Sequence, residues 1–192
     1  MLRHKEVEAK YAAENIKREA FLGIIETFPI RKKMNVSSYD TYFMNDAGDF
    51  VRYRWTDDRG ELTIKRKTVK VNNFDRIEVN LPTDGDNVST VTAFCGLLGY
   101  KFNFEIFKTC NIFWVDKVVM AYYVVFDKEL KELRRFIEIE ADEDLEWESE
   151  EQAWNEVVKY EKLFEVLDII PQNRLHKSLF EIFSKPTNHY SP

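Results

Sequence analysis

Cysteine, histidine and glycine are scarce in this sequence, and each shortage excludes a class of protein. The 192 residues include two cysteines, Cys95 and Cys110, which do not form a paired Cys-x-x-Cys spacing. A disulfide scaffold and a cysteine-based zinc site are therefore not expected, and a reducing cytosol fits the sequence best. The three histidines, His4, His176 and His189, are too scattered for an imidazole-rich zinc site.

Long apolar runs and an excess of basic charge are missing as well. No run of roughly eighteen uncharged apolar residues occurs, and the first residues are charged, unlike those of a signal peptide. Neither membrane insertion nor secretion is expected, so we expect a cytoplasmic protein. The formal net charge of −6 argues against general affinity for nucleic acid, because binding the phosphate backbone requires a surplus of Lys and Arg.

Aromatic and charged residues are abundant. Fifteen Phe, nine Tyr and four Trp stand against six Gly, which favours broad aromatic strands over a loop-rich fold. The composition is 44% hydrophobic and 32% charged, typical of a globular protein. The length fits one domain. We expect that domain to span residues 1–184, with residues 185–192 as a C-terminal tail.

The periodicity of the sequence predicts an α+β fold. A two-residue alternation or a β-rich run, bounded by turn-forming residues, predicts eight strands at 5–11, 38–44, 50–55, 61–67, 76–81, 101–109, 113–127 and 134–141. The seventh of these is expected to bend near Asp116-Lys117. Helices are expected from Ile16 to Phe28, from a Ser89 cap to Gly99, and from a capping box at Ser149 towards Pro171.

Several of the predicted strands carry charged side chains on one face only. That face is acidic on the first and last strands, at Glu6, Glu8, Glu138 and Glu140, and basic on the middle ones, at Arg52, Arg54, Lys65 and Lys67. A sheet with a solvated face would explain the alternation alone. If the sheet closes into a barrel with this face inward, one wall offers carboxylates to a hard cation and the other offers cations to phosphate oxygens.

These residues resemble the CYTH superfamily, the triphosphate tunnel fold shared by class IV adenylate cyclases and thiamine triphosphatases. The family opening, Glu-x-Glu-x-Lys, is matched by Glu6, Glu8 and Lys10. In the family's order there follow Asp40–Phe43, Arg52 with Arg54, Thr63 with Lys65, Arg76 with Glu78, the helix end Leu97–Tyr100, Lys108, Val125–Asp127, and Phe136–Glu140. The resemblance spans nearly the whole chain.

Two positions depart from the family pattern. The family's Lys-x-Arg becomes Lys108-Thr109-Cys110, so a thiol stands where a guanidinium is expected on the phosphate. This change is open to three readings: a different substrate, compensation by Lys117 or Arg134, or binding without catalysis. Near the end of the chain, Lys177-Ser178-Leu179 resembles a family motif in which an aromatic residue takes the place of Leu179.

The resemblance implies an eight-stranded antiparallel β-barrel, the triphosphate tunnel, with helices packed outside. It implies Mg²⁺ or Mn²⁺ as cofactor, with ligands at Glu6, Glu8, Asp127, Glu138 and Glu140. It implies triphosphate binding by Lys10, Arg52, Arg54, Lys65, Lys67, Arg76 and Lys108. Glu6, Glu8 and Lys10 are the expected catalytic residues, and catalysis would consist mostly of positioning and charge neutralisation.

Three functions follow as hypotheses. The first is a class IV adenylate cyclase, which converts ATP to cyclic AMP and pyrophosphate. The second is a triphosphatase that hydrolyses inorganic tripolyphosphate, thiamine triphosphate or a nucleoside triphosphate. The third is a non-catalytic nucleotide or polyphosphate binder, which Cys110 motivates. In each case the expected partner is a small-molecule triphosphate, with no nucleic acid and no membrane, and the protein is expected to be a monomer or a homodimer.

Overall fold

A single antiparallel sheet of eight strands organises the computed structural model, which describes residues 7–56, 59–67, 76–84 and 87–184. The strand order is β1-β8-β7-β6-β2-β3-β4-β5. The strands are β1 (Glu8–Ala12), β2 (Ile30–Met44), β3 (Phe50–Trp55), β4 (Arg59–Lys67), β5 (Arg76–Asp84), β6 (Lys101–Val115), β7 (Val118–Phe126) and β8 (Glu132–Ala141). The expected α+β class and all eight strands are confirmed.

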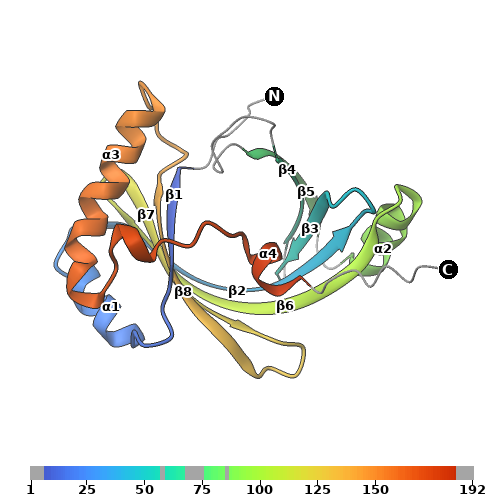
Figure 1. Cartoon of the computed structure of the whole chain (residues 1–192), viewed down its shortest axis with the longest axis horizontal. Helices are drawn as coiled ribbons and strands as arrows, with labels where there is room; N and C mark the ends of the chain where they lie inside the picture. The colour runs from blue at the N-terminus through green and yellow to red at the C-terminus, as the bar shows by residue number, and fades with distance from the viewer. Residues whose placement is uncertain (1–6, 57–58, 68–75, 85–86, 185–192) are drawn as a thin grey trace.

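The sheet curves so strongly that its two edge strands, β1 and β5, face each other across a concave side (Figure 1). Within the described ranges no ladder joins β1 to β5, so the sheet is an open barrel and not a closed one. Its curvature is consistent with the expected tunnel. The concave side is the inner wall on which the charged side chains were expected to lie.

The alternation of strand residues assigns the two faces. On β1, Ala9 and Tyr11 are buried in the apolar cluster of the convex side, while Glu8 and Lys10 line the concave side. On β8, Ile137 and Ile139 join the same convex cluster. The charged face therefore points inward, as expected for the tunnel that the resemblance implies.

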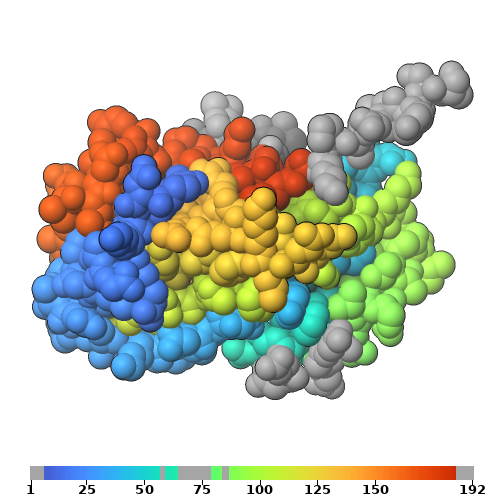
Figure 2. Space-filling model, turned by 90° about the horizontal axis from the view of Figure 1, so that it is seen from below, coloured from blue at the N-terminus to red at the C-terminus, as the bar shows by residue number. Residues whose placement is uncertain are grey.

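Helices cover the convex face at both ends of the sheet (Figures 1 and 2). At one end lie α1 (Arg18–Ile25), α3 (Glu150–Glu161) and the short 3₁₀ helix η1 (Lys162–Leu167), and at the other end lies α2 (Val88–Leu97). Phe21 of α1 stacks on Phe164 of η1 with ring centroids 5.5 Å apart. The expectation that the helices pack outside the sheet holds for these four.

The short helix α4 (Leu179–Phe183) is the exception, because it lies on the concave side (Figure 1). Leu179 and Phe180 belong to an apolar cluster with Tyr42, Phe50 and other inward-facing residues. The aromatic residues at that end of the concave face would be exposed without a cover, and α4 provides it. The helix begins at Ser178 with a complete capping box to Glu181.

Several element boundaries differ from those expected. β2 begins at Ile30 and not at Ser38, and β6 continues to Val115 past the expected end at Thr109, because the two strands pair along almost their whole length. The bend expected near Asp116 is the turn between β6 and β7. The cap of α2 is Asn87 and not Ser89, whereas the cap of α3 is Ser149 as expected, its hydroxyl accepting from the backbone N–H of Gln152 at 3.1 Å.

The segment that leads to α4 is fastened to β1. After the 3₁₀ turn η2 (Pro171–Asn173), the backbone N–H of Leu175 donates to the carbonyl of Lys10 at 2.7 Å. Beside this contact the guanidinium of Arg174 donates through both Nε and Nη2 to the buried carboxylate of Glu161, and the Tyr11 hydroxyl donates to the same carboxylate. The Glu161 contacts thus join β1, α3 and the segment that positions α4.

We predict that Glu161→Ala lowers the free energy of unfolding by about 3 kcal/mol, because it leaves Arg174 and Tyr11 without their shared acceptor in a largely buried place. Urea denaturation followed by circular dichroism measures this change. The matched control is Lys159→Ala, which removes two exposed ion pairs, with Asp116 and Glu156, and should cost less than about 1 kcal/mol. Equal costs for the two variants would contradict the role given to Glu161.

Candidate functional site

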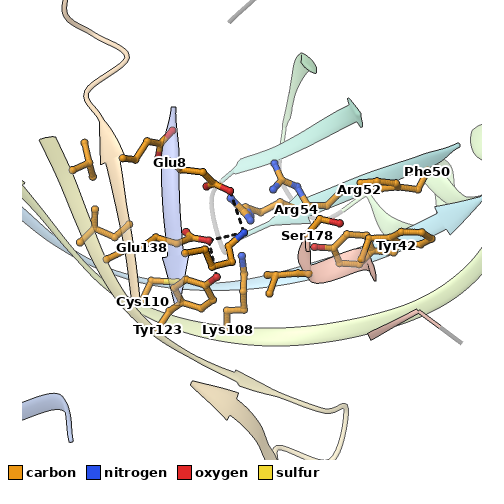
Figure 3. A pocket seen from close by; sticks show the side chains of 17 residues that line it. Glu8, Tyr42, Phe50, Arg52, Arg54, Lys108, Cys110, Tyr123, Glu138 and Ser178 are labelled. Carbon is orange, nitrogen blue, oxygen red and sulfur yellow. Dashed lines mark hydrogen bonds and ion pairs between the residues drawn. The ribbon is translucent and has the colours of Figure 1, made fainter. Parts of the chain in front are cut away.

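A cavity of about 250 Å³ opens on the concave side of the sheet (Figure 3). Charged side chains from four strands line it. They are Glu8 and Lys10 of β1, Arg52 and Arg54 of β3, Lys108 of β6, and Glu138 and Glu140 of β8. Seven of the residues expected at the site from sequence are therefore gathered in one place.

The acidic side of the cavity is built by the pairing of β1 with β8. Glu8 stands opposite Glu140, and Lys10 opposite Glu138, in the register of these two strands. The ammonium of Lys10 lies 3.2 Å from Glu8 Oε1 and 2.9 Å from Glu138 Oε1. Two carboxylates therefore converge on one cation; in Figure 3 dashed lines mark the contacts that Glu8 and Glu138 make.

These contacts hold the charges in place despite burial. Burial opposes the charge of Lys10, but the carboxylates of Glu138 and Glu8 raise the pKa of its ammonium above the usual value. Burial likewise opposes ionisation of Glu138, but Lys10 lowers the pKa of that carboxyl. Both groups are therefore charged at neutral pH.

Tyr123 of β7 completes the acidic side. Its hydroxyl donates to Glu138 Oε1 at 2.8 Å, and burial together with the Glu138 charge raises the pKa of the phenol well above its usual value. The tyrosine therefore stays protonated and holds one oxygen of Glu138. Tyr123 is not among the site residues expected from the sequence. The alternation of β7, which places it on the same face as Ala121, is the signal that would have identified it.

A divalent cation fits the chemistry of this side, because carboxylate oxygens are the ligands that Mg²⁺ and Mn²⁺ prefer. Glu8, Glu138 and Glu140 line the cavity together. In the described part of the chain, no three His, Cys, Asp or Glu side chains are already arranged around a single point as ligands would be. The Lys10 ammonium instead lies between two of the carboxylates.

Asp127 lies apart from the other expected metal ligands. It follows β7, and its carboxylate accepts the backbone N–H groups of Glu129 and Lys131 at 2.9 Å each, so it shapes the turn to β8. Ala121, the register partner of Glu138, is six residues back along the strand, which corresponds to about 20 Å. Asp127 and Glu138 therefore do not converge in this structure, and a metal role for Asp127 stays a prediction.

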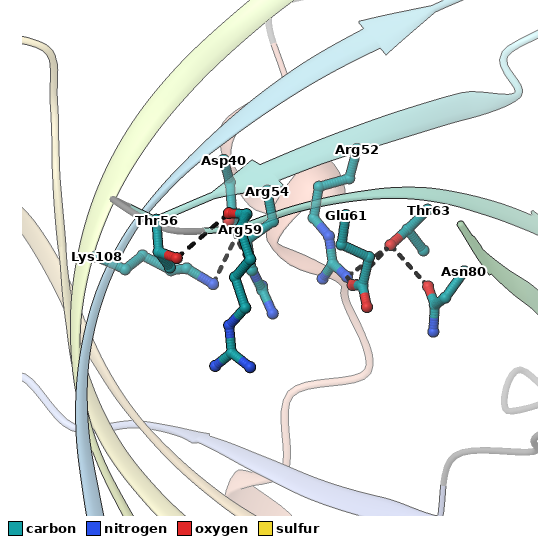
Figure 4. A network of polar contacts seen from close by, with 9 residues as sticks. All are labelled: Asp40, Arg52, Arg54, Thr56, Arg59, Glu61, Thr63, Asn80 and Lys108. Atoms are coloured by element: carbon teal, nitrogen blue, oxygen red, sulfur yellow. Dashed lines mark hydrogen bonds and ion pairs between the residues drawn. The ribbon is translucent and has the colours of Figure 1, made fainter. Parts of the chain in front are cut away.

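The basic side of the cavity is organised by the fully buried Asp40 of β2 (Figure 4). Arg54 donates to it through two nitrogens, Nε at 2.8 Å and Nη2 at 3.0 Å, and the Lys108 ammonium lies 2.8 Å from its Oδ2. Burial alone would raise the pKa of Asp40, but Arg54 and Lys108 hold it well below its usual range. Burial, aided by the charge of Arg54, lowers the pKa of Lys108.

Arg52 is positioned by the neighbouring strands. Its Nη2 donates to Thr63 Oγ1 at 2.9 Å and to Glu61 Oε1 at 3.2 Å, and the Thr63 hydroxyl donates to Asn80 Oδ1 at 2.8 Å (Figure 4). These contacts extend from β3 through β4 to β5. The guanidinium is therefore held from one side by the sheet itself.

Four expected site residues are not placed by these observations. Glu6 lies outside the described residues. For Lys65, Lys67 and Arg76 the structure describes the backbone alone: Lys65 stands opposite Glu78, and Lys67 opposite Arg76, in the pairing of β4 with β5. Their roles in binding stay predictions.

Cys110 lines the cavity next to Lys108 on the same face of β6, where the resemblance leads one to expect an arginine. Burial raises the pKa of its thiol. Neither of the two cations considered as a replacement lines the cavity: Lys117 is exposed in the β6–β7 turn, and Arg134 donates to Glu14 at 2.5 Å. The wall around Cys110 is instead apolar, with Ile112, Val119 and Ala121.

The helix α4 closes one end of the cavity. Ser178, Leu179 and Phe180 line it, and the Phe180 ring stacks on Phe50 with centroids 4.3 Å apart. Leu179, which replaces an aromatic residue of the family motif, is buried in the same apolar cluster. The change at this position therefore keeps an apolar side chain against the concave face.

Comparison with solved structures finds this fold in several proteins. A conserved hypothetical protein from Pyrococcus furiosus superposes with a TM-score of 0.69 at 23% identity, over 92% of this chain and 98% of the other. A protein from Bacillus halodurans, named provisionally as an adenylate cyclase, superposes with a TM-score of 0.62 at 14% identity, over 95% and 99%. A chain of the Schizosaccharomyces pombe Mediator head module has a TM-score of 0.60 at 10% identity, over 84% and 94%.

These likenesses, all below 25% identity, show a shared fold. No protein-family model and no curated protein matches the chain. Proteins with very different names share the fold, so activity has to be argued from the site. In the described residues no helix has the length and apolar character needed to cross a bilayer.

The buried carboxylates predict a specific loss of stability in acid. The pKa values of Asp40 and Glu138 are lowered in the folded state. As the pH falls towards about 4, the ordinary pKa of a carboxyl group, the unfolded chain therefore binds more protons than the folded chain. The stability that these groups contribute is complete above about pH 5 and is lost as the pH falls below it. Asp40→Asn should unfold more easily at neutral pH and show a shallower acid dependence.

Urea unfolding at a series of pH values tests this prediction, with Glu132→Gln as the control because its exposed pair with Arg135 contributes little. The control should follow the wild-type curve. An Asp40→Asn curve parallel to that of the wild type would show that Asp40 is not the group whose protonation weakens the fold.

Proposed function

We propose that the cavity binds a triphosphate together with Mg²⁺ or Mn²⁺, and that the protein is a triphosphate-processing enzyme of the CYTH type. The observation that supports this most is the segregation of charge across one cavity: carboxylates on β1 and β8 face cations on β3 and β6. A metal–triphosphate complex carries both charges, so it complements the two sides at once.

The acidic side is the proposed metal site, with Glu8, Glu138 and Glu140 as ligands. When bound, the metal would neutralise phosphate charge and activate water or a ribose hydroxyl. Tyr123 holds one oxygen of Glu138 through its hydroxyl and thereby orients the carboxylate. Lys10, which now contacts Glu8 and Glu138, is long enough to contact a phosphate oxygen instead.

The basic side is the proposed phosphate site. Three cations, Arg52, Arg54 and Lys108, face two carboxylates, Asp40 and Glu61, which leaves one positive charge in excess. A triphosphate carries several negative charges, so this excess is too small to balance it alone. On the acidic side Lys10 is outnumbered by Glu8, Glu138 and Glu140, so it supplies no spare positive charge. A divalent cation would neutralise those carboxylates and part of the phosphate charge, which is the physical reason to expect metal dependence.

The first candidate reaction is that of a class IV adenylate cyclase. The ribose 3′-hydroxyl of ATP would attack the α-phosphorus, the bond from that phosphorus to the β-phosphate oxygen would break, and pyrophosphate would leave with the hydroxyl proton released to solvent. The apolar wall of Ile112, Val119 and Ala121 supports this candidate, because an organic group needs such a surface and a bare phosphate chain does not.

The second candidate is a triphosphatase, in which water attacks the terminal phosphorus, the bond from that phosphorus to the bridging oxygen breaks, and the diphosphate leaves while the attacked phosphorus becomes orthophosphate. The size of the cavity supports it: about 250 Å³ is slightly below the range of about 300–1,000 Å³ that is usual for drug-sized ligands. Such a space suits a phosphate chain better than a whole nucleotide. A non-catalytic binder, supported by the thiol of Cys110 in the wall, is the third.

One assay separates the candidates. The purified protein is incubated with ATP, thiamine triphosphate or tripolyphosphate in the presence of Mg²⁺ or Mn²⁺, and the products are resolved by chromatography. Cyclic AMP with pyrophosphate supports the cyclase, orthophosphate the triphosphatase, and tight binding without product the binder. No binding of any of the three would contradict the proposal as a whole.

We predict that Glu138→Gln lowers the metal-dependent turnover by at least roughly tenfold, because it removes a ligand charge while keeping the shape of the side chain. The control is Glu156→Gln, the same change on the outer helix α3, which should leave turnover unchanged. Wild-type activity of Glu138→Gln would rule out Glu138 as a metal ligand.

We also predict that tripolyphosphate with Mg²⁺ slows the alkylation of Cys110 by iodoacetamide, since the thiol lines the proposed phosphate site. Mass spectrometry of the Cys110 peptide follows the reaction. Sulfate at the same ionic strength is the control and should protect less. Equal alkylation rates with and without tripolyphosphate, at a concentration that saturates binding, would mean that the ligand binds elsewhere.

A further inference from the structure

The segment that forms α2 contains no charged residue, although the chain is rich in them. The fourteen residues from Asn87 to Tyr100 include no Asp, Glu, Lys or Arg, in a sequence that is 32% charged. This segment includes the whole of α2. An exposed helix normally keeps charged residues on its outer face, so this helix lacks the usual marks of a solvated surface.

The helix also exposes large apolar side chains on one flank. Val91 and Cys95 are buried against the sheet. Phe94, Leu97 and Leu98 follow at the spacing of adjacent helix positions, and between 51% and 88% of each remains exposed. Leu97 is the most exposed of the three, at 88%. The apolar flank is therefore wider than the sheet beneath it can cover.

Neighbouring strands extend this flank. Ile64 of β4 stands opposite Val79 of β5, and Leu62 opposite Leu81. Ile64, Val79 and Leu81 are exposed, whereas Leu62 is buried in the cluster that α2 covers. Leu62 is buried together with Val91 and Cys95 of α2, so the exposed side chains beside it on β4 and β5 border the area that α2 covers.

We propose that this surface, the α2 patch (Ile64, Val79, Leu81, Phe94, Leu97 and Leu98), is the interface with a second copy of this chain. The exposed surface of these six residues equals that of about three fully exposed large apolar residues. At about 200 Å² for each such residue, the patch has an area of roughly 600 Å². That is already at the upper end of the apolar patches of monomers. The uncharged outer face of α2 adds area towards the roughly 800 Å² per partner of a standard interface.

The lack of charge on α2 suits a second copy as the occupant. Two chains with a net charge of −6 repel each other, and an uncharged surface is where they can meet without placing like charges in direct contact. A two-fold dimer brings the same surface of both chains together, so an apolar patch is complementary to itself. A helix that lies on a membrane surface carries Lys or Arg on its polar face, and the Asn87–Tyr100 segment has none.

The patch lies at the opposite end of the sheet from α1 and α3 (Figures 1 and 2). The interface therefore leaves the concave cavity accessible from outside. Dimerisation is independent of the proposed activity, so a failure of one leaves the other standing.

The test measures the mass of the full chain in solution by light scattering and sedimentation velocity over a hundredfold range of concentration. The wild type should have about twice the chain mass of 22.9 kDa. Leu97→Lys and Leu81→Lys, from the helix and the strand of the patch, should each reduce the mass to that of one chain. Both residues are exposed, so the variants should fold normally. Circular dichroism should therefore show the same spectrum as the wild type and a cooperative melting transition.

The matched control is Val166→Lys in η1, at the other end of the molecule, where an equally apolar side chain is 80% exposed. It should remain dimeric. A wild type of monomeric mass throughout the range would overturn the proposal, and so would a Leu97→Lys variant that stays dimeric. If the wild type associates and Val166→Lys alone disrupts it, the interface lies at η1 and not at the α2 patch.

Discussion

The carboxylate of Asp40 lies fully buried within 3.0 Å of nitrogens from both Arg54 and Lys108, and this contact allows cations to stay charged on the inner face of the sheet. A buried charge without a partner would cost several kcal/mol. On the acidic side the Lys10 ammonium is the counter-charge that allows the carboxylates of Glu8 and Glu138 to stay ionised. Each side of the cavity thus holds its own counter-charge, and the side chains that would bind a ligand are oriented before it arrives.

Strand pairing converts these local contacts into a cavity with two chemically distinct sides. β1 pairs with β8, so residues from the two ends of the chain meet as one acidic surface. β2 lies between β3 and β6, which brings Asp40 next to Arg54 in register and Ser38 next to Lys108. The curvature of the sheet then turns the acidic and basic strands towards each other (Figure 1). A ligand carrying both charges is the complement of that arrangement.

Much of this could be predicted from the sequence, because alternation along a strand is a local property. Glu8, Lys10, Arg52, Arg54 and Glu138 were assigned to one face from their spacing, and the structure places them on one cavity. What could not be predicted depends on contacts between distant segments. The place of α4 follows from the fit of Leu179 and Phe180 to concave aromatics, the hydroxyl of Tyr123 matters only beside Glu138, and the separation of Asp127 from Glu138 follows from strand register.

The central claim is that one cavity holds a divalent cation on its acidic side and phosphates on its basic side. Anomalous diffraction from crystals grown with Mn²⁺ and tripolyphosphate tests it most directly. The account predicts a manganese peak within coordination distance of Glu138 and of at least one of Glu8 and Glu140, with phosphate density at Arg52, Arg54 and Lys108. Manganese and phosphate bound only outside this cavity would contradict it.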